Sequence, residues 1–244
     1  MEYAVIVENL RKTFGKVVAV DDLSFYVKPG EIFGLIGPNG AGKTTTLRIL
    51  STLLLPTSGK VEIYGHNVVE EPETIRRIIS YLPEEGGAYE QLTGREYLEF
   101  MANFIEDDKE KIKEIVNEAA EISGLGSRLA DKIKTYSKGM KRRLLVARSL
   151  MIKPKLAILD EPTSGLDVIH AVHVRNVIKE YAKEHEVTII LSSHNMLEIE
   201  HICDRVVIMN LGRKVIEGNP QELKEKFAAE NLEELFVMAV KKHA

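Results

Sequence analysis

One eight-residue run constrains the fold of this chain more than any other feature. Residues 37–44 read Gly-Pro-Asn-Gly-Ala-Gly-Lys-Thr and match the pattern G-x-x-x-x-G-K-[ST]. A strand is expected at 31–36, directly before the motif, and leucines at helical spacing follow the motif until Pro56 stops the segment. A strand, a glycine-rich loop and a helix in this order form a phosphate cradle, so the sequence predicts an α/β fold built around a phosphate site.

The residue types of this loop explain the chemistry expected of it. Glycine lets the backbone curl until successive N–H groups point at phosphate oxygens, and the helix that follows adds partial positive charge. Lys43 is expected to reach the β- and γ-phosphates of ATP, and the Thr44 hydroxyl is expected to ligate Mg²⁺. A glycine-rich turn with an incidental lysine is the other reading, which the order of strand, loop and helix disfavours. The residues predicted to hold the nucleotide here are Gly37, Pro38, Asn39, Gly40, Ala41, Gly42, Lys43, Thr44 and Thr45.

Two carboxylates follow a second buried strand. The run 156–159 is entirely apolar and ends in Asp160 and Glu161. Ligands of open parallel sheets bind at the carboxyl ends of the strands, so both side chains are expected beside the phosphate loop. Asp160 is then positioned to hold Mg²⁺, and a carboxylate at Glu161 can orient or deprotonate an attacking water. Such a pair alone is usually a solvated turn, and it gains its significance from the phosphate loop.

Strand and helix patterns divide the chain into three parts. Short strands with turn signals predominate before residue 93, and helical spacing of apolar residues continues from there. Strands return afterwards, and their unbroken apolar runs predict a parallel sheet that is covered on both faces. We therefore expect an α/β core over about 1–92 and 152–220, a helical insert over about 93–151 and a C-terminal helical tail over about 221–244. The expected strands lie within 3–7, 17–27, 31–36, 60–64, 78–82, 156–159, 187–191 and 205–209.

Composition limits the partners of the chain. The 244 residues carry a formal net charge of −4, which argues against a dedicated nucleic-acid binder. The single cysteine, Cys203, cannot form an internal disulfide, so we expect a core thiol in a reducing compartment. The N-terminal residues show no signal-peptide pattern, and no apolar run reaches the roughly 20 residues that span a bilayer. A role at a membrane therefore requires a partner that supplies the spanning helices.

An ordered set of motifs resembles the ATPases of ABC transporters. The phosphate loop is followed by Tyr-Ser-Lys-Gly-Met at 136–140, by the acidic pair, by Ser-Gly-Leu-Asp at 164–167 and by His194. The pentapeptide matches the family signature LSGGQ only at Ser137 and Gly139. The resemblance covers essentially the whole chain. It implies a P-loop NTPase fold with a RecA-like core, an N-terminal antiparallel β subdomain and a helical insert.

The same resemblance implies a role for individual residues. Glu161 matches the catalytic base, and Lys43 and His194 match residues that contact the γ-phosphate. Phe14 stands where the family places an aromatic ring against adenine, and Asp167 belongs to the segment called the D-loop. The simpler interpretations are that Phe14 lies in the core and that His194 is structural or exposed.

The sequence departs from the family pattern at two positions. Glu84 stands where the family usually has a glutamine, and a carboxylate there can still offer oxygen to Mg²⁺, so the expected metal ligands are Thr44, Asp160 and Glu84. Lys138 replaces a signature glycine and is tolerable if its side chain points away from the nucleotide. The plain reading of the signature is a helix cap and a turn. The basic run 141–143 behind it reads as a solvated helix face.

Three softer similarities indicate the kind of ABC protein, one of them the signature Tyr-Ser-Lys-Gly-Met at 136–140. Segments 81–96 and 231–236 are similar to the ATP-binding subunits of ABC-2-type exporters. The resemblance implies a subunit that hydrolyses ATP and powers export through a separate transmembrane permease, from the cytoplasmic face of the cell membrane. It also implies a homodimer, or a pseudo-dimer with a related subunit, in which Ser137 and Gly139 complete the γ-phosphate site of the opposite chain.

Two other classes of protein stay open at this stage. One is a soluble ABC ATPase with a non-transport role. Repair and chromosome proteins of that kind insert long coiled coils between the phosphate loop and the acidic pair, and no sustained heptads occur here between Lys43 and Asp160. The other is a nucleotide-dependent regulatory module that does not hydrolyse ATP, which the presence of Glu161 and His194 disfavours.

Overall fold

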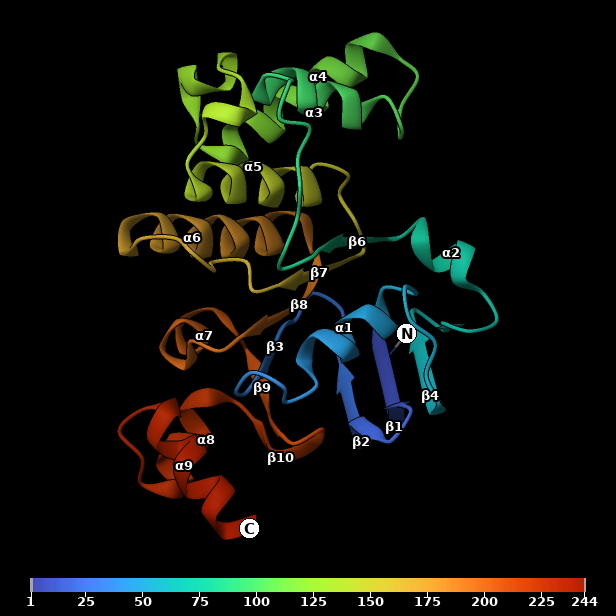
Figure 1. Ribbon diagram of the computed structural model, residues 1–244, viewed down its shortest axis with the longest axis vertical. Coiled ribbons are helices and arrows are strands. Elements are labelled where there is room, and N and C mark those ends of the chain that lie inside the picture. Colours follow the sequence, from blue (N-terminus) through green and yellow to red (C-terminus); the bar gives the residue numbers. More distant parts are fainter. Residues whose placement is uncertain (1, 244) are drawn as a thin grey trace.

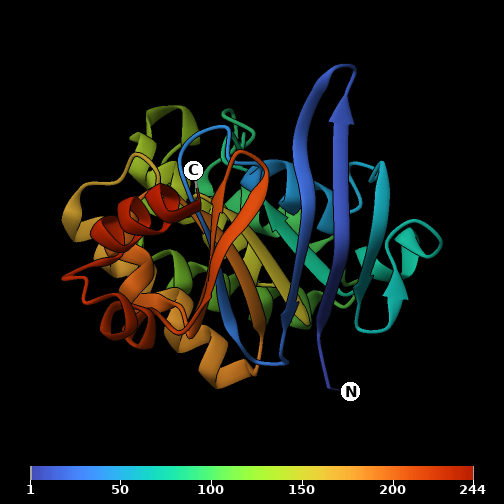
Figure 2. The same ribbon diagram turned by 90° about the horizontal axis from the view of Figure 1, so that it is seen from below.

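Two sheets organise the fold, which the computed structural model describes for residues 2–243, the side chains at 197, 198, 242 and 243 excepted. Strands β1 (Val5–Phe14), β2 (Val17–Val27), β4 (Ser58–Ile63) and β5 (His66–Asn67) form an antiparallel sheet in the order β2-β1-β4-β5. Figure 2 shows the long β1–β2 hairpin extending beyond the rest of the molecule. The hairpin therefore presents its tip to solvent.

Strand β1 is longer than the sequence pattern predicts. The pattern indicates a strand at 3–7, because Val5 and Val7 alternate with more exposed residues, yet the strand continues to Phe14. Asn9 has a positive φ of 49°, and the pairing with β2 shifts register between Val7 and Leu10. Such a bulge changes which side chains face the core. The alternation of apolar and polar residues in the sequence therefore ends at the bulge, although the strand continues beyond it.

The second sheet carries the phosphate loop. Its strands are β3 (Ile32–Ile36), β6 (Ile79–Leu82), β7 (Leu156–Asp160), β8 (Thr188–Ser193), β9 (Arg205–Asn210) and β10 (Arg213–Gly218). They pair in the order β10-β9-β3-β8-β7-β6, all parallel except β10 against β9. Every residue of β3, β7 and β8 is buried, as expected for a parallel sheet covered on both faces. The register pairs Ile36 with Ser193 and Asp160 with Ser192, which brings the carboxyl ends of three strands together.

Helices cover both faces of this sheet. The flanking helices are α1 (Lys43–Leu50), α2 (Pro72–Arg76), α6 (Val168–His185), α7 (Met196–Ile202), α8 (Pro220–Phe227) and α9 (Leu232–His243). One core joins α1 and the antiparallel sheet to Phe33 and Ile158, and the other joins α6 to Ile36 and Leu159. Side chains along β3 and β7 alternate between the two cores, because neighbouring side chains of a strand point to opposite faces of the sheet. No helix within residues 2–243 is long and apolar enough to cross a bilayer.

A helical insert separates β6 from β7. It contains α3 (Gly94–Ala102), α4 (Lys109–Ser123) and α5 (Lys138–Leu150), with 3₁₀ turns at Gly126–Ala130 and Ile133–Thr135. Local sequence fixes the ends: Thr93 and Glu96 form a capping box on α3, and Gly124 ends α4 at φ 57°. In Figure 1, α3 and α4 lie farthest from the sheets, and α5 lies between them and α6. Helix α5 is thus the layer that joins the insert to the core.

Candidate active site

The phosphate loop lies between β3 and α1 and requires glycine at two close contacts. Gly42 has a left-handed φ of 98°, and a Cβ on it would lie 2.5 Å from the carbonyl oxygen of Ala19. A Cβ on Gly37 would lie 2.3 Å from the carbonyl oxygen of Met209. Only glycine leaves this room, so the backbone can keep the curled path that turns N–H groups inward.

A cavity of about 410 Å³ opens over this loop. Its lining comes from residues 17–19 of β2, residues 39–45 of the loop and α1, and residues Glu84 and Glu161. The loop residues expected to bind nucleotide are therefore gathered around one hollow, with Glu84 and Glu161 facing them from two other segments. Gly37 and Pro38 contribute instead through their carbonyl groups, which hold Lys43.

Lys43 is buried under the loop, with 6% of its surface exposed. Its ammonium group donates to the carbonyl oxygens of Gly37 at 2.7 Å and Pro38 at 3.2 Å. Burial lowers the pKa of Lys43, and the nearby Glu161 carboxylate, whose Oε1 lies 3.9 Å away, opposes that shift. The cation is thus held at the cavity wall by groups that an incoming phosphate oxygen can replace.

Asp160 ends β7 fully buried, and one of its oxygens has no partner. Oδ1 accepts from the Thr44 hydroxyl at 3.2 Å and from the Ser192 hydroxyl at 2.5 Å. Oδ2 is buried without a hydrogen-bond partner within the described part of the chain. A buried, unpartnered carboxylate oxygen beside a threonine hydroxyl is an oxygen donor set that fits Mg²⁺.

Glu161 is held in an uncommon backbone conformation. Its φ is 51°, and its N–H donates to the hydroxyl oxygen of Ser192 at 3.0 Å and to the Ser192 carbonyl at 3.2 Å. Its Oε2 lies 2.9 Å from Nδ1 of His194, which is half-exposed. Burial raises the pKa of Glu161, and the hydrogen bond with His194 opposes that shift. The carboxylate therefore bridges Lys43 and His194 at the cavity.

Sequence reasoning missed two residues of this region. Ser192 holds both Asp160 and the backbone of Glu161, and its signal was the polar run 192–194 at the end of an apolar strand. The expectation of a solvated face at 141–143 is wrong for Arg142, which is 5% exposed. Burial lowers the pKa of Arg142 to about 10, so the side chain stays charged at neutral pH.

The signature and the D-loop lie together, apart from the cavity lining. Ser137 caps α5 by accepting from the N–H of Met140 at 3.1 Å, and a Cβ on Gly139 would lie 3.2 Å from Cδ2 of Leu166. The Lys138 side chain packs over Gly165, where a Cβ would lie 2.6 Å from its Cε. Ser137, Gly139 and Asp167 line no part of the phosphate cavity.

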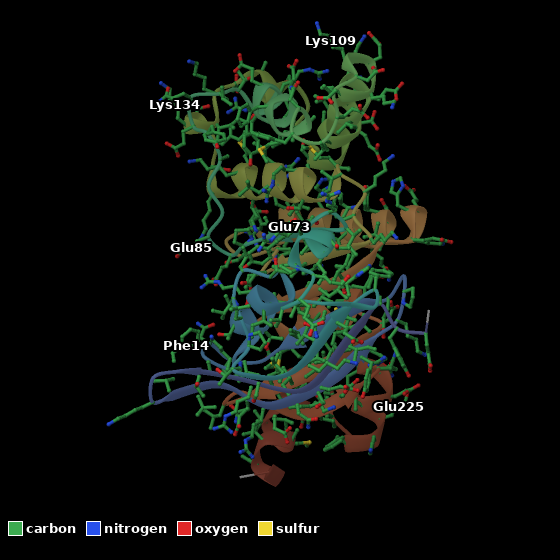
Figure 3. The ribbon with its side chains drawn as sticks, turned by 90° about the vertical axis from the view of Figure 1, so that its right-hand side faces the viewer. Phe14, Glu73, Glu85, Lys109, Lys134 and Glu225 are labelled. Atoms are coloured by element: carbon green, nitrogen blue, oxygen red, sulfur yellow. The ribbon has the colours of Figure 1, made fainter. Side chains whose placement is uncertain are left out.

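Asp167 begins α6 by accepting from the N–H of His170 at 3.0 Å. Phe14 ends β1 at the hairpin tip (Figure 3) and is 49% exposed, which excludes the core reading. The Lys12 ammonium lies 4.9 Å from its ring centroid. The Phe14 ring is not among the cavity walls, although residues 17–19 of the paired strand are.

These features define a class of protein. A glycine-rich loop between a parallel strand and a helix faces two carboxylates at the end of another strand of the same sheet. That arrangement is typical of P-loop nucleotide hydrolases. The comparisons with known proteins identify the family within this class.

A family model described as "ABC transporter" matches residues 20–164. Bacitracin transport ATP-binding protein BcrA of Bacillus licheniformis is 42% identical over 218 residues, which are 89% of this chain and 70% of BcrA. Linearmycin resistance ATP-binding protein LnrL of Bacillus subtilis is 36% identical over 233 residues, 96% of this chain and 75% of LnrL. The chain belongs to the ABC transporter family, and these relatives are ATP-binding proteins of transport and resistance systems.

Solved structures agree with this assignment. The structure of an ATP-binding subunit of an ABC transporter superposes with a TM-score of 0.86 at 30% identity, over 97% of this chain and 99% of that one. The ATP-binding cassette MJ0796, a dimer in a post-hydrolysis state with ADP and Pi, superposes with a TM-score of 0.80 at 25% identity, over 88% and 98%. The expected P-loop NTPase fold and the ABC ATPase class are both confirmed.

Proposed function

We propose that this chain binds Mg·ATP, hydrolyses it and powers export through a separate membrane permease. The observation that carries the proposal is the position of Glu161, whose carboxylate lies between Lys43 and His194 on the wall of the phosphate cavity. A carboxylate in that position can act as the base that takes a proton from an attacking water. Export is supported by the relatives, which include bacitracin transport and linearmycin resistance proteins.

The chain's own residues would bind the nucleotide through the loop. Backbone N–H groups of 39–45 would hold the phosphates, and Lys43 would exchange its bonds with Gly37 and Pro38 for β- and γ-phosphate oxygens. The Thr44 hydroxyl and the free Oδ2 of Asp160 would hold Mg²⁺. The cation, once bound, supplies positive charge that offsets the charge developing on the phosphates.

Hydrolysis would depend on a proton transfer at Glu161. The buried carboxylate accepts a proton more readily than an exposed one, since burial raises its pKa. His194 would orient the carboxylate through its 2.9 Å contact and would contact the γ-phosphate from its exposed side. Glu84 would approach the same phosphates from the loop after β6 and would add an oxygen near Mg²⁺.

The signature residues would act on a second chain. Ser137, Gly139 and Asp167 lie outside the phosphate cavity of their own chain, which supports an arrangement in which they complete the site of a partner. The N-terminus of α5 would then face the partner's γ-phosphate. Phe14, exposed at the hairpin tip, would stack on adenine that extends beyond the phosphate cavity.

A docking face for the permease is supported by exposed aromatic rings. Tyr89, Phe100 and Phe104 contact one another edge to face at 5.2 and 5.1 Å and are 40–70% exposed. Phe100 and Phe104 lie on the insert, and Tyr89 lies on the segment 84–91, which begins with Glu84. A partner seated there would therefore reach the nucleotide site through one loop. Such a partner would place the chain on the cytoplasmic face of the membrane.

Phosphate release by the purified chain tests the proposal. Wild type is expected to turn over ATP with Mg²⁺ and to stop when EDTA removes the metal. Glu161→Gln is expected to keep ATP affinity and to lose roughly 10²–10⁴-fold in kcat. Glu186→Gln is the matched control, because Glu186 is also a glutamate with positive φ (53°) and lies outside the cavity. Equal turnover by Glu161→Gln and wild type would reject the catalytic assignment.

A further inference from the structure

One buried guanidinium connects the signature helix to both loops that carry acidic residues into the cavity. Arg142 lies in the second turn of α5. Its Nη1 donates to the carbonyl oxygens of Pro83 at 2.8 Å and Glu84 at 3.1 Å. Its Nη2 donates to the carbonyl oxygens of Asp160 and, at 2.6 Å, Glu161, and its Nε donates to that of Pro162 at 3.1 Å. Five backbone carbonyls thus match the five N–H donors of one arginine.

We propose that Arg142 is a positioning residue for ATP hydrolysis, which fixes Glu84 and Glu161 to each other and to the signature helix. Within the described part of the chain its guanidinium forms no ion pair, although the charges of Asp160, Glu161 and Glu84 raise the pKa of Arg142 against the effect of burial. Burying a charge is costly unless other groups compensate it, and here backbone dipoles of two loops do so. An apolar side chain would fill this space at a lower desolvation free energy, but it would form no hydrogen bonds between the two loops.

The backbone of Glu161 shows what the arginine holds in place. A positive φ is unfavourable for glutamate and persists only where the surroundings stabilise it. The Ser192 hydroxyl accepts from the N–H of Glu161, and Arg142 donates to the carbonyl oxygens of Asp160 and of Glu161 itself. The side chain is thereby directed at Lys43 and His194.

The same guanidinium holds a second segment that lines the cavity. Pro83 and Glu84 follow β6, and Glu84 lines the cavity. Because α5 is one continuous helix from 138 to 150, a shift at its N-terminus moves Arg142 and, with it, both loops. Contact of Ser137 with a partner's nucleotide would in this way be transmitted to the chain's own Glu161. This transmission rests on the proposed split site, whereas the positioning of Glu161 does not.

The adjacent arginine is a matched control. Arg143 also lies on α5 and also binds backbone carbonyls, those of Ser123 at 2.9 Å and of Gly124. These carbonyls lie at the C-terminal end of α4. Arg143 therefore joins α5 to α4 within the insert and contacts no residue that lines the cavity. The two arginines therefore share helix, charge and type of partner, and differ in which segments they hold.

Steady-state ATP hydrolysis and ATP binding by the full chain test the proposal. Arg142→Gln is expected to lower kcat by about tenfold or more while KM and Kd for ATP stay within about threefold, since the phosphate loop is untouched. Arg142→Lys, which keeps the charge and some donors, is expected to recover part of the lost kcat. Arg143→Gln is expected to lower the melting temperature while leaving kcat near that of wild type.

Several results would overturn the proposal. One is an unchanged kcat in Arg142→Gln below its melting temperature, which would make the arginine merely structural. Another is an equal kcat loss in Arg143→Gln, which would indicate general loosening of α5. If Arg142→Gln does not fold, Arg142→Lys decides alone, and wild-type kcat in that variant rejects the role. Inactive wild type would instead reject the proposed function, so the two failures are distinguishable.

Discussion

Replacing Phe14 by alanine should weaken nucleotide binding through the loss of adenine stacking, with little change in the stability of the fold. The ring is 49% exposed at the hairpin tip, so its loss should change the free energy of unfolding by only about 0.5 kcal/mol. Stacking of a base on an aromatic ring is worth roughly 1–3 kcal/mol. Lys12 lies 4.9 Å from the ring centroid and already engages the ring, so we expect the lower part of that range, about 1–2 kcal/mol.

This energy corresponds to a roughly 5- to 30-fold weaker binding of nucleotide. ATP and ADP should lose affinity equally, because stacking does not sense the γ-phosphate, and isothermal titration calorimetry measures both. Tyr26→Ala is the control, since Tyr26 is a similarly exposed ring (38%) on the paired strand β2 that lines no part of the cavity. Unchanged affinity in Phe14→Ala, or a loss confined to ATP, would refute the stacking role.

Three further variants probe the phosphate site. Lys43→Ala should weaken ATP binding by more than about tenfold in a titration, since charge-assisted bonds to two phosphates are lost; wild-type affinity would contradict its role. Glu84→Gln should leave ATP affinity within about twofold while shifting the Mg²⁺ concentration that half-saturates turnover, and the reverse pattern would contradict a metal-side role. Gly42→Ala should lower both the melting temperature and ATP affinity, because its Cβ would meet a carbonyl oxygen at 2.5 Å, whereas Gly87→Ala, with nothing within 4 Å, should change neither.

The sequence predicts those parts of the site that depend on the succession of residues within a short stretch of chain. The phosphate loop needs only a strand, glycines and a helix in succession, and the cavity gathers its residues 39–45 as expected. Asp160 and Glu161 follow from an apolar strand that ends in acids, and the register with β8 brings them to the same edge. These features carry their own signals over short stretches of chain.

The parts that sequence misses depend on contacts between distant segments. Arg142 stands in a basic run that reads as solvated, yet its partners lie 18–20 residues later at Asp160–Pro162 and 58–59 residues earlier at Pro83–Glu84. Ser192 likewise acquires its role from Asp160, 32 residues away. Hydropathy and charge patterns describe one element at a time, so they cannot show that a cation is enclosed by two loops.

The oligomeric state of Glu161→Gln under light scattering tests the central claim, that signature residues of one chain complete the nucleotide site of another. We predict that ATP with Mg²⁺ shifts this variant from monomer to dimer, because the γ-phosphate bridges both halves only before hydrolysis. ADP should leave it monomeric, and adding Ser137→Arg should block the ATP-driven shift. A variant that stays monomeric with ATP, while wild type hydrolyses ATP at a rate linear in protein concentration, would contradict the shared site.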